Sequence, residues 1–161
     1  MTNSVYVCKL KIKNGVIKVA EKMEISPAEW QVMRIAWTLQ KVTSSQVIEI
    51  LQRKKNWKPA TVKTLLRRLV QKKVLVTTKQ GRYFIYQPCV QEQETMNLAA
   101  DDLFSSMCEM HVGRTLAHVI EEHQLSKKDI SNLQELLNKK ALNAPDAVEC
   151  NCVPGEEMHC E

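Results

Sequence analysis

Apolar residues recur every three or four positions in three segments between residues 26 and 71, and this spacing predicts three amphipathic helices. The segment "SPAEWQVMRIAWTLQ" opens with Ser26, a proline and Glu29, a capping pattern that predicts a helix over residues 27–40. "TSSQVIEILQRKK" predicts a second helix capped by Thr43 or Ser44, and "KPATVKTLLRRLVQKK" predicts a third. The residues expected to face inward are Trp30, Met33, Trp37, Val47, Ile50, Leu51, Val62, Leu65, Leu66 and Leu69.

The pattern then changes to two β-rich runs, "VLVTTKQ" and "YFIYQP", on either side of Gly81. Two such runs around a glycine-containing turn predict a β-hairpin, and Pro88 ends the second run. Three short helices followed by a hairpin predict a winged helix-turn-helix, a DNA-binding variant of the helix-turn-helix, over residues 23–88.

Helical spacing returns after Pro88, over residues 92–111, 113–123 and 127–141. We expect residues 89–143 to form a helical dimerisation region, with an apolar stripe from Met96 to Met110 in the dimer core. The fold class is therefore mainly α with a small β-hairpin wing. Residues 1–22 form an N-terminal extension that two hypotheses explain equally well: a hairpin around the Asn14-Gly15 turn, or a dispensable segment before a start at Met23.

Charge divides the chain into two halves. Residues 1–88 hold 18 Lys and Arg against 4 Asp and Glu, whereas residues 89–161 hold 5 against 14, within a total of +5. A strongly basic half favours a polyanionic partner. We see no secretory signal and no apolar run of membrane-spanning length, so we expect a cytoplasmic protein that does not bind membranes, with reduced thiols.

The third predicted helix has a polar face suited to DNA. Short hydroxyl side chains let a helix enter the major groove, and Lys or Arg reach guanine edges or phosphates. A solvated basic face would look similar on a lone helix, but two supporting helices and a basic hairpin make DNA binding the better interpretation. The candidate DNA-contacting residues are Thr61, Lys63, Thr64, Arg67 and Arg68 on the helix, with Lys79 and Arg82 on the wing.

Three runs of sequence are specific enough to indicate a family: "ISPAEWQVMRIAW", "WKPATVKTLLRRLVQKKVL" and "GRYFIYQP". Together they resemble the BlaI/MecI/CopY family of bacterial winged-helix repressors, from about Met23 to Ala141. The resemblance implies a homodimer on a palindromic operator, typically of the TACA…TGTA type. It also implies that the candidate residues above contact bases and phosphates.

The C-terminal segment, residues 144–161, separates the branches of that family. The β-lactam branch is typically cleaved at an Asn-Phe bond, and this chain has no Asn-Phe dipeptide. The copper branch carries two Cys-x-Cys motifs. Here "CNC" at residues 150–152 matches the first, whereas "MHC" at residues 158–160 has methionine where the third cysteine is expected, so a four-thiolate copper cluster is in doubt.

Ligand chemistry still supports a metal-binding tail. Cu(I) prefers soft donors, which Cys150, Cys152, Cys160 and Met158 supply, whereas Zn(II) would take the three cysteines with His159. An unstructured tail with incidental thiols is less consistent with this spacing in a reducing compartment. Cys8, Cys89 and Cys108 are isolated in the sequence, and we expect them to be buried as small apolar residues.

The sequence thus favours a copper-responsive transcriptional repressor, closest to the CopY branch. Its dimer would bind operator DNA with Zn(II) in the tail and release it when Cu(I), delivered for example by a copper chaperone, replaces zinc. The alternatives are a β-lactam-type (penicillinase) repressor with a non-sensing tail and a zinc-stabilised protein-interaction module. We find no nucleophile–base pair, phosphate loop or paired acidic motif, and so do not expect an enzyme.

Overall fold

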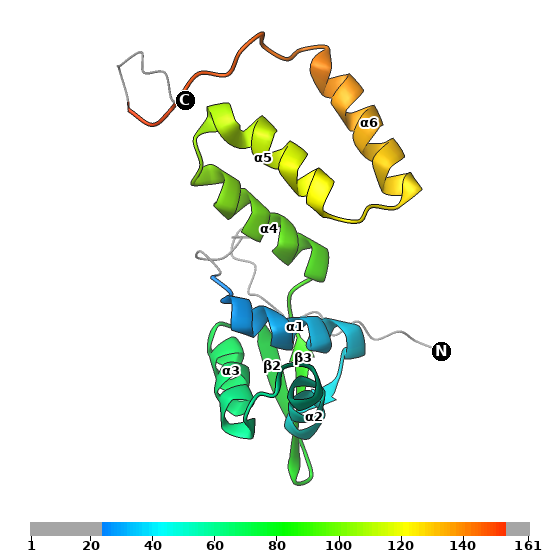
Figure 1. Cartoon of the computed structure of the whole chain (residues 1–161). Coiled ribbons are helices and arrows are strands. Elements are labelled where there is room, and N and C mark those ends of the chain that lie inside the picture. The colour runs from blue at the N-terminus through cyan, green and yellow to red at the C-terminus, as the bar shows by residue number, and fades with distance from the viewer. Residues whose placement is uncertain (1–23, 154–161) are drawn as a thin grey trace, which may run out of the picture. The chain divides into compact units, whose positions relative to one another are not determined.

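The computed structural model describes residues 24–153 (Figure 1). The expectations for residues 1–23, including the start at Met23 and the alternative hairpin, lie outside this range. The chain divides into two compact units with a boundary between Ala99 and Ala100, and we call their described parts the winged-helix unit (24–99) and the C-terminal unit (100–153). The elements are α1 Pro27–Leu39, β1 Val42–Thr43, α2 Ser44–Lys55, α3 Pro59–Gln71, β2 Leu75–Gln80, β3 Tyr83–Pro88, α4 Glu92–Ser105, α5 Glu109–Glu122 and α6 Lys127–Ala141.

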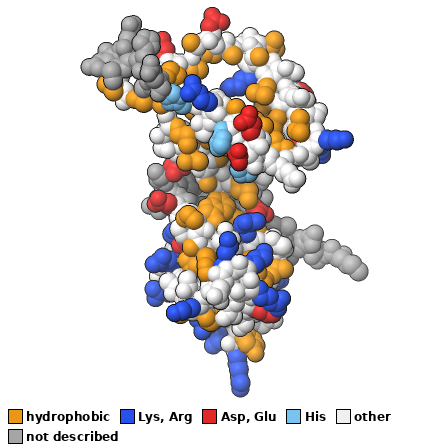
Figure 2. Space-filling view, in the orientation of Figure 1, with side chains coloured by type: hydrophobic (Ala, Val, Ile, Leu, Met, Phe, Trp, Pro, Cys, Tyr) orange, Lys and Arg blue, Asp and Glu red, His pale blue; other side chains and the backbone are white. Residues whose placement is uncertain are grey.

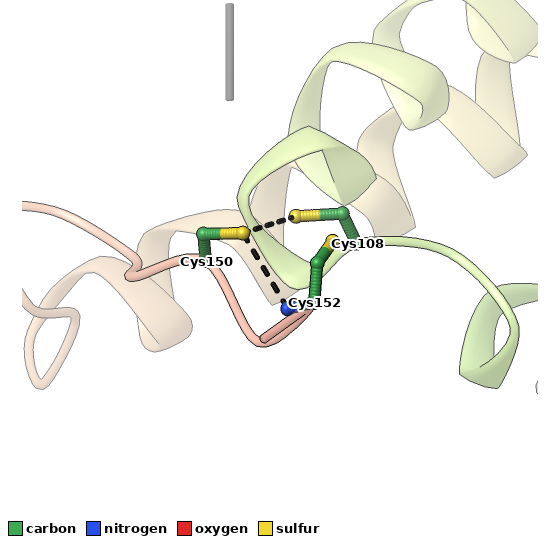
Figure 3. Close-up of side chains that lie close together, drawn as sticks. All are labelled: Cys108, Cys150 and Cys152. Carbon is green, nitrogen blue, oxygen red and sulfur yellow. Dashed lines mark hydrogen bonds between the residues drawn. The ribbon is translucent and has the colours of Figure 1, made fainter. Parts of the chain in front are cut away.

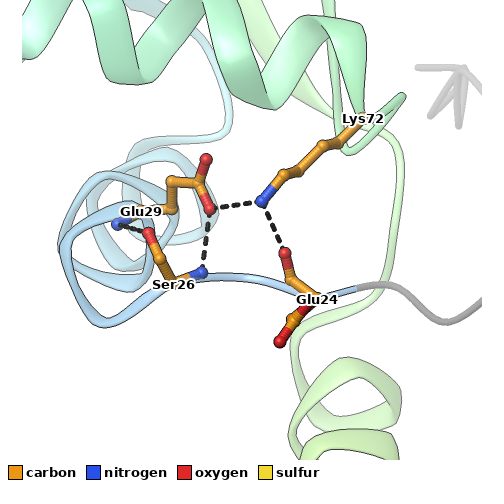
Figure 4. A network of polar contacts seen from close by, with 4 residues as sticks. All are labelled: Glu24, Ser26, Glu29 and Lys72. Atoms are coloured by element: carbon orange, nitrogen blue, oxygen red, sulfur yellow. Dashed lines mark hydrogen bonds and ion pairs between the residues drawn. The ribbon is translucent and has the colours of Figure 1, made fainter.

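The predicted capping box begins α1. The Glu29 backbone N–H donates to Ser26 Oγ, and the Ser26 backbone N–H donates to Glu29 Oε2 at 2.8 Å (Figure 4). Each residue thus satisfies a backbone donor that the first helical turn leaves unpaired. The helix buries its apolar face, including Met33 and Trp37, and the Trp30 and Trp37 ring centroids lie 5.6 Å apart.

Glu29 also connects α1 to the end of α3. Its side chain is only 1% exposed, and Lys72 Nζ donates to Glu29 Oε2 at 2.7 Å and to the Glu24 carbonyl oxygen at 2.5 Å (Figure 4). Burial by itself would raise the pKa of Glu29. The hydrogen bonds from Lys72 and Ser26 outweigh that effect and hold the pKa below its ordinary value. A buried carboxylate is therefore stabilised in its charged form, with Lys72 as its partner.

The second and third helices also begin and end at recognisable residues. Thr43 caps α2 in a second capping box with Gln46, and Asn56 ends the helix in the left-handed conformation. Pro59 occupies the first turn of α3, where its missing N–H costs no hydrogen bond. The four residues predicted to face inward from α3, namely Val62, Leu65, Leu66 and Leu69, are all buried.

A three-stranded antiparallel sheet with strand order β1-β3-β2 completes the winged-helix unit. The predicted hairpin is confirmed, and Gly81 takes a positive φ of 59° in its turn, a conformation that side chains disfavour. Strand β1 pairs Val42 with Tyr86, which fixes the start of α2 to the hairpin. The fold is therefore a winged helix-turn-helix, as the sequence predicts.

One core holds this unit together. Its buried apolar residues come from α1, α2, α3 and the start of the sheet: Val32, Met33, Ile35, Ala36, Trp37, Val42, Val47, Leu51, Val62, Leu65, Leu66, Leu69, Val74 and Leu75. Trp30 and Ile50, which we expected to face inward, are half-buried against this core. The segment after the hairpin is also attached to it, because Trp37 Nε1–H donates to the Val90 carbonyl at 2.9 Å.

The helix predicted over residues 92–111 is in fact two helices. Helix α4 ends at Ser105, and α5 begins at Glu109 with Cys108 in an extended conformation at its N-cap. Ser105 Oγ and Ser106 Oγ donate to the carbonyls of Asp102 and Leu103 and tighten the end of α4. The apolar spacing continues across this break, so periodicity alone did not show it. Met110 consequently lies on α5.

Helices α5 and α6 bury none of their side chains, although every residue of both is described. Most of their large apolar residues are instead exposed, among them Leu116, Val119, Ile120, Ile130, Leu136 and Leu137. Within residues 24–153, no helix is both long enough and apolar enough to span a membrane.

Candidate nucleic-acid interface and metal centre

The face of α3 opposite the core carries the predicted DNA-contacting residues. All five are exposed: Thr61, Lys63, Thr64, Arg67 and Arg68. The helix contains no acidic residue, so nothing on it neutralises these cations. Thr64 donates its hydroxyl proton to the Ala60 carbonyl at 2.9 Å, which leaves the oxygen as an acceptor. The arrangement presents a basic helix surface with short polar side chains near its start.

The wing adds basic side chains beyond the helices. Lys79 and Arg82 are exposed at and beside the turn between β2 and β3, and Lys79 pairs across the hairpin with Phe84. Figure 2 shows Lys and Arg side chains distributed over the winged-helix unit and at the tip of its hairpin. Both predicted groups of DNA-contacting residues are therefore accessible. Their contacts with bases and phosphates remain predictions.

Three cysteine sulfur atoms meet in the C-terminal unit. Cys108 Sγ, Cys150 Sγ and Cys152 Sγ all lie within 4.8 Å of one another, and Cys108 and Cys150 are 3.6 Å apart at sulfur (Figure 3). Cys108 stands at the N-cap of α5, whereas the other two come from the Cys-x-Cys motif after α6. Cys108 and Cys150 are half-buried, and Cys152 is exposed. We call these three residues the cysteine cluster.

Two backbone donors hold the tail in this position. The Cys152 N–H donates to Cys150 Sγ at 3.4 Å, which folds the Cys-x-Cys motif so that both thiols face the same side. The Glu109 N–H, an unpaired donor of the first turn of α5, donates to Asn151 Oδ1 at 3.2 Å. The residue between the two tail cysteines therefore caps α5 and brings the motif next to Cys108.

The closeness of the three thiols affects their protonation. Hydrogen bonding with Cys150, and next with Cys108, raises the pKa of Cys152 to about 12, because these bonds favour the protonated thiol; burial and the charges of the neighbouring sulfurs act in the same direction. A bound cation reverses this effect, since it stabilises neighbouring thiolates and displaces their protons. The cluster is thus a set of donors whose charge a soft cation would balance.

Comparison with known proteins places the chain in a family. The family model described as penicillinase repressor matches residues 25–139. The chain belongs to the penicillinase repressor family. Members of this family are transcriptional repressors, and the exposed basic face of α3 suits that role.

Several relatives of this repressor are similar over most of its length. A 16.5 kDa protein from the ptsI 3′ region of Latilactobacillus sakei is 47% identical over 138 residues, which are 86% of this chain and 94% of that protein. The methicillin resistance regulatory protein MecI of Staphylococcus aureus is 31% identical over 117 residues, 73% of this chain and 95% of MecI. Among solved structures, the DNA-binding domain of the repressor BlaI is 35% identical, covers 46% of this chain and 90% of that chain, and has a TM-score of 0.43.

The structure brings together only part of the predicted metal site. Cys150 and Cys152 adjoin each other as expected, whereas Met158, His159 and Cys160 lie outside the described residues. Our interpretation of Cys108 as an isolated packing residue does not hold, because its sulfur lies beside the Cys-x-Cys motif.

No local signal in the sequence identified Cys108 as a candidate ligand, since 42 residues separate it from Cys150. Cys89 differs from Cys108: its Sγ lies 3.0 Å from the Lys73 carbonyl, in the winged-helix unit.

Proposed function

We propose that this protein is a copper-responsive repressor that binds a palindromic operator as a homodimer and releases it when Cu(I) replaces Zn(II) in the C-terminal tail. It acts in the cytoplasm, where operator DNA and reduced thiols coexist. Linkage sets one requirement for release: Cu(I) must bind the DNA-free form more tightly than the DNA-bound form.

The basic surface of α3 and the wing supports the DNA-binding part of this proposal. Exposed lysines and arginines provide contacts to phosphates, and two threonines on the same face suit the major groove. Among the similar solved structures is the BlaI monomer of Bacillus licheniformis in complex with the blaP half-operator, 37% identical and covering 44% of this chain and 87% of that one, with a TM-score of 0.40. An operator built from two half-sites is expected for a dimer of such units.

The uncovered apolar residues of the C-terminal unit support the dimer. Monomeric soluble proteins rarely expose extended apolar surface, and larger patches mark interaction sites. Here both α5 and α6 expose several leucine, valine and isoleucine side chains. A second copy of the same helices offers a complementary apolar partner, as in most homo-oligomers with twofold symmetry.

The observation that carries the copper proposal is the cysteine cluster. Two of its three sulfurs come from the tail motif that the sequence associates with metal, and all three lie close enough to share one ion. Thiolates select Cu(I) and Zn(II) over harder cations. Zinc in the DNA-binding form would use Cys150, Cys152, Cys160 and His159, and Cu(I) displaces it because it binds thiolates more tightly.

The competing function is a β-lactam-type repressor, and the similarity to MecI and to penicillinase repressors favours it. In that case the tail would not sense metal, and inactivation would require proteolysis. The chain lacks the Asn-Phe dipeptide that the resemblance associates with cleavage. The two functions differ in one measurable property, namely whether Cu(I) alone releases operator DNA.

The test measures binding of the full-length protein to a TACA…TGTA operator duplex, anaerobically, with Zn(II) and then with increasing Cu(I). We expect Cu(I) to release the wild-type protein. A variant that lacks residues 146–161 should stay bound, because the removed segment follows α6 and contributes nothing to the winged-helix core.

Cys89→Ser serves as the matched thiol control and should respond like the wild type. Release of the tail-deleted protein at the wild-type copper concentration would contradict the assignment of the sensor to the tail. Failure of Cu(I) to release the wild-type protein would favour the β-lactam alternative.

A further inference from the structure

Cys108 lies where two segments that are distant in the sequence meet. Its sulfur is 3.6 Å from Cys150 Sγ, and the neighbouring Glu109 N–H is bonded to Asn151 of the tail. The tail therefore contacts the start of α5 through a backbone-to-side-chain hydrogen bond as well as through sulfur. Two independent contacts at one point indicate a defined docking position for the Cys-x-Cys motif.

The spacing of the three sulfurs fits a shared metal ion. A metal–sulfur bond of about 2.3 Å places two ligand sulfurs roughly 3.8 Å apart in a tetrahedral site and roughly 4.0 Å apart in a planar triangle. The observed separations, 3.6 Å for one pair and no more than 4.8 Å for any, bracket these values. Small rotations about the Cα–Cβ bonds would bring all three sulfurs into range of one ion.

The number of donors favours a three-coordinate ion. Structural zinc is almost always four-coordinate, and the cysteine cluster supplies three ligands within the described residues. Cu(I) is a soft ion with a filled d shell that accepts three thiolates without a fourth ligand. It binds as each thiol transfers its proton to the buffer, with no change in oxidation state.

The surroundings of the cysteine cluster supply contacts and charges that suit a bound cation. The Cys152 N–H already donates to Cys150 Sγ, and such outer contacts stabilise and orient metal-bound thiolates. Glu109 and Glu149, next to Cys108 and Cys150 in the sequence, add attraction for a cation.

We propose that Cys108 is a metal ligand that completes, with Cys150 and Cys152, a three-thiolate Cu(I) site at the start of α5. The identity of the ion rests on the proposed function, whereas the ligand set rests on the geometry. The site differs from the tail-only set of donors that the sequence predicts, because one ligand belongs to the helical region. Met158 and Cys160 are not required for it.

Because of its position, Cys108 would connect a metal-bound tail to the helices of the C-terminal unit. Cys108 is separated from the end of α4 by only two residues, and α4 is the helix that contains the boundary between the two units. An ion bound by Cys108 therefore fixes the tail to the α4–α5 junction. Copper would act by restraining that junction, at the edge of the helices proposed to form the dimer.

The experiment uses the full-length protein, reduced and anaerobic, loaded with Cu(I) alone and treated with a thiol-alkylating reagent. Mass spectrometry then reports the modification of each cysteine. We expect Cu(I) to protect Cys108, Cys150 and Cys152 together and to leave Cys89 as reactive as in the metal-free protein. Alkylation of Cys108 at an unchanged rate in the Cu(I)-loaded protein would overturn the proposal.

A second measurement compares Cu(I) affinity of Cys108→Ser and Cys89→Ser by competition with a chromogenic Cu(I) chelator. We expect Cys108→Ser to lose at least about tenfold in affinity, since even outer-shell partners of metal ligands contribute about 10–100-fold. Cys89→Ser should match the wild type. Equal affinities of the wild type and Cys108→Ser would also overturn the proposal. If Cys108→Ser does not fold, the alkylation of the wild-type protein decides.

Operator release separates this proposal from the proposed function. If Cu(I) protects Cys108 but does not release the wild-type protein from DNA, the three-thiolate site stands and copper regulation fails. If Cu(I) releases the wild type and Cys108→Ser at the same concentration, with Cys108 unprotected, copper regulation stands and the three-thiolate site fails.

Discussion

The winged-helix unit and the C-terminal unit differ in how far they bury their apolar residues. The first has a core of its own, in which residues such as Leu66 and Val62 are fully buried. The second contains the end of α4, α5, α6 and the described part of the tail, and α5 and α6 bury none of their side chains. Apolar burial is the main driving force of folding, so the first unit has the means to fold alone, whereas the second leaves apolar surface for the partner copy proposed above.

The same contrast appears in charge and in chemistry. The basic residues are concentrated in the half that contains the winged-helix unit, whereas the half that contains the C-terminal unit is acidic and includes the cysteine cluster. The molecule thus has its exposed basic surface on the unit with its own core and its candidate metal site on the region proposed to dimerise. Under the proposed function, a change in association or in the α4–α5 junction would alter DNA binding while the structure of α3 stays intact.

The largest expected effect comes from removing the C-terminal unit. A fragment that ends at Ala99 retains the core and the Trp37–Val90 hydrogen bond, so it should be a folded monomer. Its affinity for the full palindrome should fall by about 10²–10⁴-fold, because two half-sites are no longer linked. Sedimentation and operator titration check both expectations. A fragment that still dimerises would show that the winged-helix unit carries the dimer interface itself.

A matched pair of leucine substitutions tests the contrast in burial more directly. Leu66 is 0% exposed, whereas Leu137 on α6 is 57% exposed. Leu66→Ala should destabilise the protein by about 2–5 kcal/mol through the cavity it leaves. Leu137→Ala should barely change the stability of the winged-helix unit and should weaken self-association instead.

Denaturant unfolding and concentration-dependent sedimentation separate the two effects. If Leu66→Ala and Leu137→Ala lose the same free energy of unfolding and self-association is unchanged, α6 must be covered within the monomer.

The secondary structure of the winged-helix unit could be predicted because it depends on local sequence patterns. Ser26 and Thr43 cap the helices that follow them, and Gly81 forms the hairpin turn, each within a few residues of its contacts. The break before Cys108 was missed because two serines ended α4 while the apolar spacing continued. The ion pair between Glu29 and Lys72 could not be predicted from local sequence either, because 43 residues separate the two positions.

The candidate site was predictable to the same extent. The spacing of the Cys-x-Cys motif alone indicates a metal site. The helical spacing of α3 places Arg67 and Lys63 on the face opposite the core. Cys108 could not be found in this way, because its partners depend on how the tail returns to α5. A long-range contact of this kind produces no periodic pattern in the sequence, so only the three-dimensional structure reveals it.

The smallest expected effect concerns a single side chain on α3. Arg67 is exposed on α3, and Arg67→Ala should weaken operator binding by about 1–3 kcal/mol if the guanidinium reads a base. Arg34→Ala on α1 removes the same charge from an exposed helix position outside α3, the wing and the proposed dimer helices, and serves as the control, with operator affinity unchanged. Titrations on operator and random duplexes at several salt concentrations distinguish the roles of Arg67. Loss of a base contact weakens binding to the operator alone, whereas loss of a phosphate contact weakens binding to both duplexes and makes the salt dependence of binding shallower. Equal binding of Arg67→Ala and wild type to both duplexes would remove this face of α3 from the interface and leave the basic wing as the main contact.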